Sequence, residues 1–463
     1  MQFSFISQPP SPKNPHTRSK FQPFLPSPSD QTMLHEWKII TSRHENLHPV
    51  AQVISRLSLS LVLYYLLRTF VFTSSLRFVP VAVLTLMVAS SFRVLTDKNG
   101  FAQSFLASGG VGSNSSRAAI VSAIAAFDGY KENTHSLLKR RYALFAKLPL
   151  AHRQIATEAG YLDRLHEMSI RIDNNARITH ALAKFARRKH SVKDYELRVA
   201  RPLSNGAVIE LLNHYVRDWS DETATERSRL FEPILTRLQK EFPAAIAGKK
   251  KVLVPGSGLA RLAYEISALG FQTQAQEYSH LMDIAAQFIF EHKGYLPGTD
   301  SGFELYPYVH EFSHQASTEA QLRSITVPDT AANPGFKKPK TLQLGYGDFT
   351  QLATTAAGQY DAVVTLYLID TAENAMKYLD AIRTLLKPGG VWINFGPLKW
   401  GTAPQVEFNL EELERVIEKF DFTIEDRFQG ENEYNGDRLG LWQGKYRIRG
   451  WIARKENATV VVE

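Results

Sequence analysis

Residues 251–265 read Lys-Val-Leu-Val-Pro-Gly-Ser-Gly-Leu-Ala-Arg-Leu-Ala-Tyr-Glu. The apolar run at 252–254 predicts a buried strand, and Gly256 and Gly258 predict a tight turn that leads into a helix. Glu277 comes 21 residues after Gly256, at the expected end of the next strand. Glycines let a ligand approach the backbone, a helix N-terminus offers free N–H groups, and an acid can accept both ribose hydroxyls. The segment therefore predicts a nucleoside cofactor site.

Strands and helices alternate through the rest of this half of the chain, which predicts an α/β fold with a doubly wound, mostly parallel, Rossmann-like sheet. Asn409 and Glu412 are spaced for a capping box at the start of a helix over 410–419. A long insert at about 288–340 is rich in aromatic residues, which favours an ordered cover over the site. The expected strands are 252–254, 271–276, 341–345, 361–368, 391–395, 423–427 and 446–453.

The segment before the sheet has apolar residues at three- and four-residue spacing, which predicts helices. The expected helices are 118–130, 136–148, 155–185 and 208–219. The chain thus divides into an N-terminal extension (1–116), a helical domain (117–248), a cofactor-binding domain (249–455) and a short tail (456–463).

The extension has three compositional parts. Residues 1–35 are rich in Pro and Ser and are expected to be disordered, and 99–116 reads as a flexible linker. Residues 57–92 are strongly apolar, but Arg68 and Arg77 divide them into pieces shorter than the roughly 20 residues of a membrane helix. A cytoplasmic or nuclear location is therefore expected, and membrane anchoring through 57–92 is the alternative.

Composition excludes several kinds of site. The chain has no cysteine, so disulfides, thiolate metal sites and a cysteine nucleophile are excluded. The net charge of +8 is spread along the chain and accompanies no nucleic-acid-binding motif, which favours a solvated basic surface over a nucleic-acid partner.

Further motifs decide between cofactors. Gly347-Asp348-Phe349 follows the third expected strand, where an acid and an aromatic ring can bind and stack an adenine. A Leu-Leu-Lys-Pro-Gly-Gly turn at 385–390 precedes the fifth strand and is typical of methyltransferase sheets. Together these motifs favour S-adenosylmethionine over a nicotinamide cofactor, although Asp348 also suits a helix N-cap.

On these motifs the chain resembles the carnosine N-methyltransferase family over about residues 117–455. The matching blocks are His214-Tyr-Val-Arg-Asp-Trp-Ser220 with Glu226-Arg227, Val252–Leu262, Gln276-Glu-Tyr-Ser279, Tyr306-Pro-Tyr-Val-His-Glu-Phe-Ser313, Val327-Pro-Asp329, Gly347-Asp-Phe349, Leu368-Ile-Asp-Thr-Ala-Glu-Asn374 and Leu386–Leu398.

The resemblance implies transfer of a methyl group from S-adenosylmethionine to an imidazole nitrogen of a histidine-containing dipeptide. It implies Asp370 as the catalytic residue, and Asp370 and Tyr446 as contacts of this small-molecule substrate. His310 is a further candidate for a substrate contact, with a structural histidine as the alternative. The expected cofactor-binding residues are His214, Arg217, Gly256, Gly258, Glu277, Asp348, Phe349 and Leu366. A homodimer is a further expectation.

Asp370 has its own chemical argument. It comes just after the fourth expected strand, where ligands bind in open α/β sheets. A carboxylate there can orient an imidazole and take up the proton that the ring loses on methylation. A helix N-cap is the competing interpretation. One departure concerns the acceptor side: where the family carries a substrate-contacting histidine, this chain has Gly401.

Residues His310-Glu-Phe-Ser-His314 fit the H-E-x-x-H zinc pattern, but Pro307 and the surrounding aromatics argue against the regular helix that a zinc site needs. We therefore expect no metal. Three functions stay open at this stage: the N-methyltransferase with carnosine or another imidazole or amine acceptor, a cofactor-binding scaffold without turnover, and a nicotinamide-dependent oxidoreductase.

Overall fold

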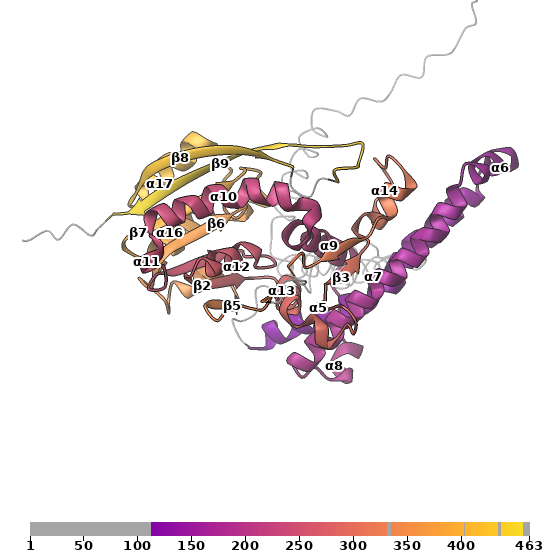
Figure 1. Ribbon diagram of the computed structural model, residues 1–463, viewed down its shortest axis with the longest axis horizontal. Coiled ribbons are helices and arrows are strands. Elements are labelled where there is room, and N and C mark those ends of the chain that lie inside the picture. Colours follow the sequence, from indigo (N-terminus) through magenta and orange to yellow (C-terminus); the bar gives the residue numbers. More distant parts are fainter. Residues whose placement is uncertain (1–112, 331–334, 402, 434–436, 457–463) are drawn as a thin grey trace, which may run out of the picture. The chain divides into compact units, whose positions relative to one another are not determined.

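The computed structural model describes residues 113–330, 335–401, 403–433 and 437–456, and within them the central element is a seven-stranded sheet (Figure 1). Its strand order is β5-β2-β1-β6-β7-β9-β8. The first five strands of this order run parallel, whereas β9 is antiparallel to both β7 and β8. The strands are β1 (Lys251–Pro255), β2 (Gln272–Glu277), β5 (Leu342–Tyr346), β6 (Tyr360–Leu366), β7 (Leu386–Gly396), β8 (Phe422–Asn432) and β9 (Tyr446–Lys455).

The Rossmann-like α/β fold expected from the sequence is therefore confirmed. The turn expected at Lys387-Pro-Gly-Gly390 is wrong, because these residues belong to β7. They form an irregularity within the strand, where the pairing of β6 with β7 shifts register between Tyr360 and Ala362. Gly389 lies there with φ 70°, a left-handed conformation that favours glycine.

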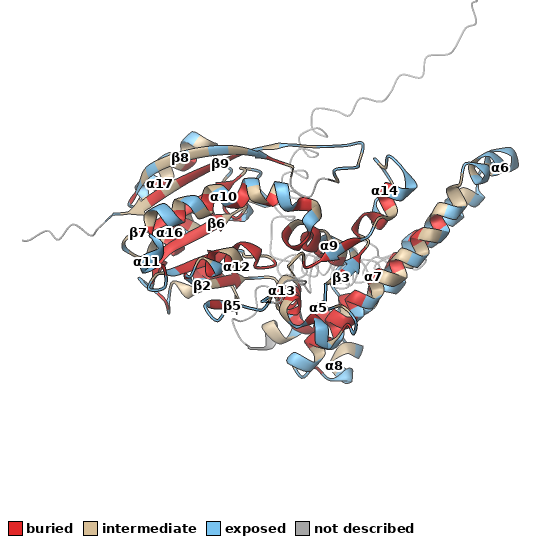
Figure 2. Ribbon diagram, viewed as in Figure 1, coloured by how far each residue is buried: buried red, intermediate tan, exposed pale blue. Residues whose placement is uncertain are grey.

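Helices cover both faces of the sheet. Along β1, Val252 and Val254 belong to the hydrophobic cluster that includes α10 (Ala224–Glu241) and α12, whereas Leu253 belongs to the cluster that includes α16 and α17. The two clusters lie on opposite faces, as the two-residue period of a strand requires. Figure 2 shows both layers as buried residues between partly exposed helices. The helices of this half, with one 3-10 turn, are α12 (Arg261–Ala268), α13 (His280–Glu291), α15 (Phe349–Leu352), η4 (Ile369–Thr371), α16 (Ala375–Leu385) and α17 (Leu410–Lys419).

The expected capping box of α17 is confirmed. The Asn409 side chain accepts from the Glu412 amide at 2.9 Å, and the Glu412 carboxylate accepts from the Asn409 amide at 3.0 Å. Two backbone donors at the helix start are satisfied in this way, which fixes where the helix begins.

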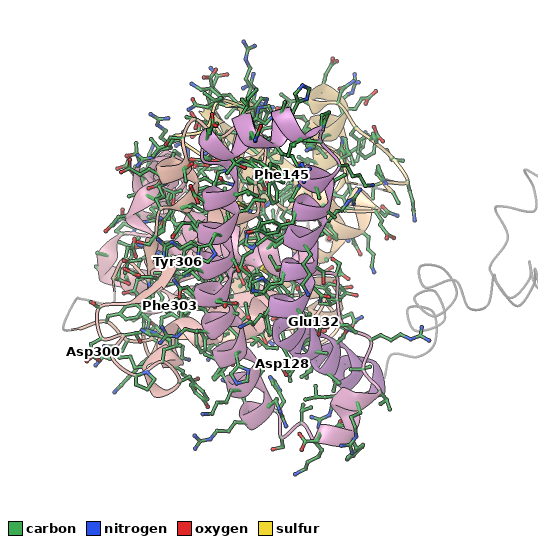
Figure 3. The ribbon with its side chains drawn as sticks, turned by 90° about the vertical axis from the view of Figure 1, so that its right-hand side faces the viewer. Asp128, Glu132, Phe145, Asp300, Phe303 and Tyr306 are labelled. Atoms are coloured by element: carbon green, nitrogen blue, oxygen red, sulfur yellow. The ribbon has the colours of Figure 1, made fainter. Side chains whose placement is uncertain are left out.

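Helices fill the chain before the sheet, with boundaries that differ from the expected ones. The segments expected at 118–130 and 136–148 merge into a single helix that ends at Ala146, and 155–185 is divided at Gly160, which has φ 84°. The Phe145 and Tyr161 rings stack near this break, with their centres 5.6 Å apart. Figure 3 shows the two long helices, α5 and α7, side by side. The elements are α5 (Ser113–Ala146), α6 (Leu150–Glu158), α7 (Tyr161–Lys189), α8 (Asp194–Arg198), α9 (Asn205–Trp219), η1 (Asp221–Thr223), α10 (Ala224–Glu241) and α11 (Ala244–Ala247).

The insert contributes to the core that these helices form. Its Phe303 is 1% exposed and packs edge-on against Tyr215 of α9 and His292 of η2. Tyr308 is also buried. Helices and insert therefore share one hydrophobic cluster. The insert comprises η2 (His292–Gly294), β3 (Phe303–Leu305), η3 (Pro307–His310), α14 (Thr318–Leu322) and β4 (Ile325–Val327).

The described residues from Ser116 onwards form one compact unit. In the part of the chain that the structure describes, no helix is both long and apolar enough to cross a membrane. The expectations for 1–35, 57–92 and residues 99–112 fall outside the described residues. The linker expected at 99–116 is wrong for residues 113–116, which belong to the first turn of α5.

Candidate functional site

The glycine turn lies at the carboxyl end of β1, beside the carboxyl end of β2. Gly256 and Gly258 have φ of 62° and 54°, a conformation that other residues adopt only with strain. The Gly258 amide donates to Glu277 Oε2 at 2.8 Å, and the Ser279 amide donates to Glu277 Oε1 at 2.8 Å. Burial raises the pKa of the Glu277 carboxyl, and the backbone amides partly offset this rise. The structure thus joins the turn and the acid that the sequence placed 21 residues apart.

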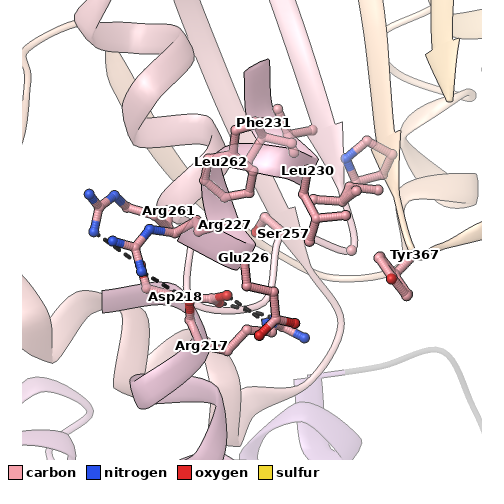
Figure 4. A pocket seen from close by; sticks show the side chains of 14 residues that line it. Arg217, Asp218, Glu226, Arg227, Leu230, Phe231, Ser257, Arg261, Leu262 and Tyr367 are labelled. Atoms are coloured by element: carbon pink, nitrogen blue, oxygen red, sulfur yellow. Dashed lines mark hydrogen bonds and ion pairs between the residues drawn. The ribbon is translucent and has the colours of Figure 1, made fainter. Parts of the chain in front are cut away.

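Arg217, at the end of α9, lies over the same turn. A Cβ at Gly258 would be 3.6 Å from Arg217 Nη2 and 3.7 Å from Asp218 Oδ2. The guanidinium pairs with Asp218 through two hydrogen bonds, at 2.7 Å and 3.1 Å (Figure 4). Burial alone would raise the pKa of the Asp218 carboxyl, but Arg217 and neighbouring positive groups hold it below its ordinary value. Sequence reasoning missed Asp218, whose one signal was its position next to Arg217.

A pocket opens beside the glycine turn, with a volume of about 580 Å³ including space open to solvent. The expected cofactor residues Arg217, Gly256 and Leu366 all line it, and Figure 4 shows Tyr367 and Glu226 at its wall. The remaining lining residues are Asp218, Arg227, Leu230, Phe231, Val254, Pro255, Ser257, Arg261 and Leu262. The pocket therefore lies where the glycine turn, the end of β6 and the helices α9 and α10 meet.

A buried ion-pair cluster fixes the end of α9 over the turn. Asp329, just after β4, binds Arg227 of α10 at 2.6 Å and Arg261 of α12 at 2.8 Å, and all three side chains are less than 10% exposed. The Asp329 amide also donates to the Trp219 carbonyl at 2.7 Å. Arg261 donates in addition to the carbonyl of Asp218 at 3.0 Å. Sequence reasoning assigned no role to Asp329, because its partners Arg227 and Arg261 are distant in the chain.

The two residues expected to hold the adenine have different environments. The Asp348 side chain caps α15 by accepting from the amide and hydroxyl of Thr350, at 2.9 Å and 2.8 Å. Phe349 is buried and packs edge-on against Tyr378. The N-cap that the sequence offered as an alternative for Asp348 is therefore present, and a cofactor role for either residue stays a prediction.

His214 lies in α9 one turn before Arg217 and is buried. Its Nε2 is 3.8 Å from Glu210 Oε1, and its Nδ1 is a buried atom with no hydrogen-bond partner among the described residues. Burial and the positive charge of Arg217 lower the pKa of the imidazole, so the ring is neutral at pH 7. Its role towards the cofactor stays a prediction.

Asp370 lies in η4, directly after the carboxyl end of β6, and is 6% exposed. Its Oδ2 accepts from the Lys399 amide at 3.0 Å. Burial raises the pKa of this carboxyl to about 6, although the Lys399 amide and charge act in the opposite direction. The same turn contacts the glycine turn, because Leu368 Cδ1 is 2.6 Å from where a Cβ at Gly256 would lie. Asp370, whose carboxyl changes its charge near neutral pH, is thus two residues after Leu368, which contacts the glycine turn.

Tyr446 reaches the same edge of the sheet because β9 is antiparallel to β7. Gly396, the last residue of β7, pairs with Arg449, so Tyr446 at the start of β9 lies beyond the end of β7. Its hydroxyl is 3.1 Å from Lys399 Nζ. Lys399 therefore contacts both Asp370, through its amide, and Tyr446, through its ammonium. Sequence reasoning assigned no role to Lys399.

His310 is part of a buried network between η3 and the helices. Its Nε2 is 2.6 Å from the Tyr130 hydroxyl, and its Nδ1 is 3.1 Å from the Pro307 carbonyl. Asn175 donates to the same Tyr130 hydroxyl at 3.3 Å. Both ring nitrogens of His310 are thus engaged, an arrangement that favours a structural role over the expected substrate contact.

The H-E-x-x-H residues do not share a regular helix, since η3 ends at His310 and His314 has φ 59°. The described residues contain no group of three or more side chains that could hold a metal ion. His314 lines a second pocket with Arg217, Tyr308 and Trp442.

Gly401 lies beside the catalytic candidate. Its amide donates to the Asp370 carbonyl at 2.9 Å. A Cβ at this position would meet one atom within 4 Å, the same carbonyl oxygen at 3.8 Å. Among the described residues, the wall beside Asp370 is therefore open where the sequence lacks the expected histidine.

Replacing Gly256 with alanine is expected to weaken cofactor binding roughly tenfold or more, equivalent to ~1.4 kcal/mol. The new Cβ would be strained at φ 62° and would lie 2.6 Å from Leu368 Cδ1, so the turn or Leu368 would have to move. Calorimetric titration with S-adenosylhomocysteine measures the change.

Gly358→Ala is the matched control, since Gly358 has φ 61° and no atom within 4 Å of an added Cβ. Both variants should lose about 1 kcal/mol of stability from backbone strain. Equal cofactor affinity in the two variants would contradict the placement of the site at Gly256.

The comparisons with known proteins agree on one family. The family model described as carnosine N-methyltransferase matches residues 196–457. The chain is similar to the carnosine N-methyltransferase of Schizosaccharomyces pombe, with 28% identity over 72% of this chain and 95% of that protein. The mouse (Mus musculus) carnosine N-methyltransferase is 29% identical over 72% of this chain and 84% of its own length. That of Dictyostelium discoideum is 32% identical over 54% of each chain.

Solved structures similar to this chain include methyltransferases. Magnesium protoporphyrin IX methyltransferase from Synechocystis, solved with bound S-adenosylhomocysteine, has a TM-score of 0.34 and 12% identity over 54% of this chain and 95% of that one. An S-adenosylmethionine-dependent methyltransferase from Aquifex aeolicus has a TM-score of 0.32 and 12% identity over 54% of this chain and 97% of that one.

Proposed function

We infer the reaction from one premise, that the chain belongs to the carnosine N-methyltransferase family. The chain is accordingly an S-adenosylmethionine-dependent methyltransferase. We propose that its acceptor is an imidazole nitrogen of carnosine or of a related histidine-containing dipeptide. A homodimer and a cytoplasmic or nuclear location remain predictions from the sequence.

The residues present fit the cofactor. A Cβ at Gly256 would clash with Leu368, so only glycine lets this turn pack closely at the wall of the pocket that Gly256 lines. Glu277 is mostly buried at the end of β2, and a carboxylate with two backbone donors retains lone pairs for ribose hydroxyls. The buried Nδ1 of His214 has no partner among the described residues, and Arg217 lies over the glycine turn. S-adenosylmethionine supplies the methyl group as a substituent of its positively charged sulfur.

Asp370 is the residue that acts on the acceptor in this proposal. Its carboxylate accepts a hydrogen bond from one ring N–H, which leaves the other nitrogen neutral with its lone pair available. As that nitrogen forms its bond to the methyl carbon, the ring loses the N–H proton to Asp370. A pKa of about 6 leaves the carboxyl mostly ionised at pH 7, ready to accept this proton. Orientation of the ring also contributes to the rate, because the attack must be in line.

The observation that carries the proposal is a buried carboxyl with a pKa of about 6, two residues after Leu368, which contacts the glycine turn. Gly401 favours a second candidate at the same site, an acceptor that is a larger or different imidazole or amine, because the wall there is open.

Methyl transfer from isotope-labelled S-adenosylmethionine to a panel of acceptors tests the proposal. The panel contains carnosine, other histidine dipeptides, free histidine and a primary amine without an imidazole. We expect the highest kcat/KM with a histidine dipeptide, and NMR of the product identifies the nitrogen that carries the methyl group. Transfer chiefly to a non-imidazole amine would support the second candidate. Cofactor binding without transfer to any acceptor would instead support a scaffold that has lost turnover.

A further inference from the structure

Lys399 lies in the loop that follows β7, where Asp370 and Tyr446 converge. Its backbone amide donates to Asp370 Oδ2 at 3.0 Å, which fixes the start of its side chain beside the carboxyl. The side chain is exposed. Lys399 is therefore next to Asp370 and Tyr446, the residues proposed to contact the acceptor, and is not part of the glycine turn.

The Lys399 ammonium is directed towards Tyr446. Its Nζ is 3.1 Å from the Tyr446 hydroxyl and 5.7 Å from the centre of that ring. The charge is close enough to Asp370 to act against the rise in its pKa. An ammonium has three donors, so it can hold a phenol and a ligand carboxylate at the same time. The described geometry thus places a cation between the two residues expected to contact the acceptor.

A histidine-containing dipeptide such as carnosine has two groups that could bind here, one to Asp370 and one to Lys399. Histidine is its C-terminal residue, so the imidazole and a free carboxylate belong to the same residue. With the imidazole on Asp370, the carboxylate remains close by and carries a charge opposite to that of Lys399. Gly401 adds no side chain that would separate them.

If the proposed reaction holds, we propose that Lys399 determines acceptor specificity by pairing with the C-terminal carboxylate of the dipeptide. The enzyme then selects a histidine with a free carboxylate over one whose carboxyl group is blocked. Lys399 acts in binding, because the carboxylate is unchanged by methyl transfer and this ion pair is the same before and after the reaction.

The test compares carnosine with its C-terminal amide in the full-length protein, in wild type, Lys399→Met and the control Lys445→Met. Lys445 is an exposed neighbour of Tyr446, so both variants lose one positive charge. Binding is measured by calorimetric titration in the presence of S-adenosylhomocysteine, and methylation by labelled transfer. We expect wild type and Lys445→Met to favour carnosine by about five- to tenfold. Lys399→Met should bind the two about equally, through a higher KM for carnosine with kcat little changed.

Each outcome separates this inference from the proposed function. Carnosine that binds but is not methylated would refute the proposed reaction, while the binding preference still decides the role of Lys399. Equal wild-type binding of acid and amide, or no binding of either, would overturn the inference. An equal loss of both acceptors in Lys399→Met would also overturn it, since that result points to a structural effect through Asp370.

Discussion

Asp370→Asn is expected to lower kcat for methyl transfer by about 10²- to 10⁴-fold, the usual contribution of a positioned general base. Asparagine has nearly the same shape and can still accept the hydrogen bond from the Lys399 amide. It cannot take up a proton at neutral pH, so the variant loses the chemical function and keeps the local structure. Cofactor affinity, measured by titration, should stay within about twofold of wild type.

The pH dependence of kcat/KM gives a second readout. In wild type both the Asp370 carboxyl, with its pKa near 6, and the acceptor imidazole must be deprotonated. As the pH increases, kcat/KM should rise steeply up to about pH 6 and level off above about pH 7. The asparagine variant should keep only the inflection of the imidazole, so the limiting slope of log kcat/KM on the acid side falls from about two to about one.

Asp370→Asn should raise the stability of the fold at alkaline pH, although it lowers kcat. A folded-state pKa of about 6 against an ordinary 3.8 means that the proton on Asp370 stabilises the fold at low pH, and this stability is lost as pH rises through 6. At pH 8 the ionised carboxylate therefore costs about 1–3 kcal/mol, which Asp370→Asn should recover. Chemical denaturation at pH 8 measures the gain.

Asp361 is the matched control, because it lies at the opposite end of β6 and pairs with Lys250 and Lys387. Burial acts to raise the pKa of the Asp361 carboxyl, but its hydrogen bonds with Lys387 and the Lys251 amide hold it below its ordinary value. The ionised form of Asp361 thus stabilises the fold at pH values above the ordinary pKa of an aspartate. Asp361→Asn should therefore lower the free energy of unfolding at pH 8 and leave kcat unchanged. A similar fall in kcat for both variants would show that Asp370 acts through the fold.

Asp329→Asn is expected to lower the free energy of unfolding by about 3–5 kcal/mol, because it leaves the buried guanidinium groups of Arg227 and Arg261 without their shared carboxylate. The same change should weaken cofactor binding, since the cluster anchors the end of α9 that carries Arg217. Urea denaturation and titration with S-adenosylhomocysteine measure the two effects.

Asp426→Asn provides the comparison. Asp426 forms an ion pair with Arg237 at 2.8 Å, but its side chain is 46% exposed. Exposed pairs contribute about 0–1 kcal/mol, so this variant should have nearly wild-type stability and cofactor affinity. Losses of similar size in the two variants would contradict a special role for the Asp329 cluster.

Local patterns predicted much of this molecule. The strands of the main sheet lie within a few residues of the expected ranges apart from longer ends on β7 and β8, and α17 begins at its expected cap. These features depend on two-residue periodicity and on capping interactions within four residues, which are visible in the sequence. The helix boundaries around Gly160 and the irregularity at Gly389 were missed, because each depends on a backbone conformation that glycine permits but does not require.

The sequence by itself determined the strands of the sheet and the glycine turn with Glu277, because strand periodicity and motif spacing are local features. Its motif blocks also showed the resemblance to the family. Only the tertiary structure decided how the acceptor side is built. It joined Lys399 to Asp370 and Tyr446, paired Asp329 with Arg227 and Arg261, and placed His310 in a network with Tyr130. The physical reason is that ion pairs, burial and the resulting pKa of Asp370 depend on residues far apart in the chain, whose meeting no local pattern encodes.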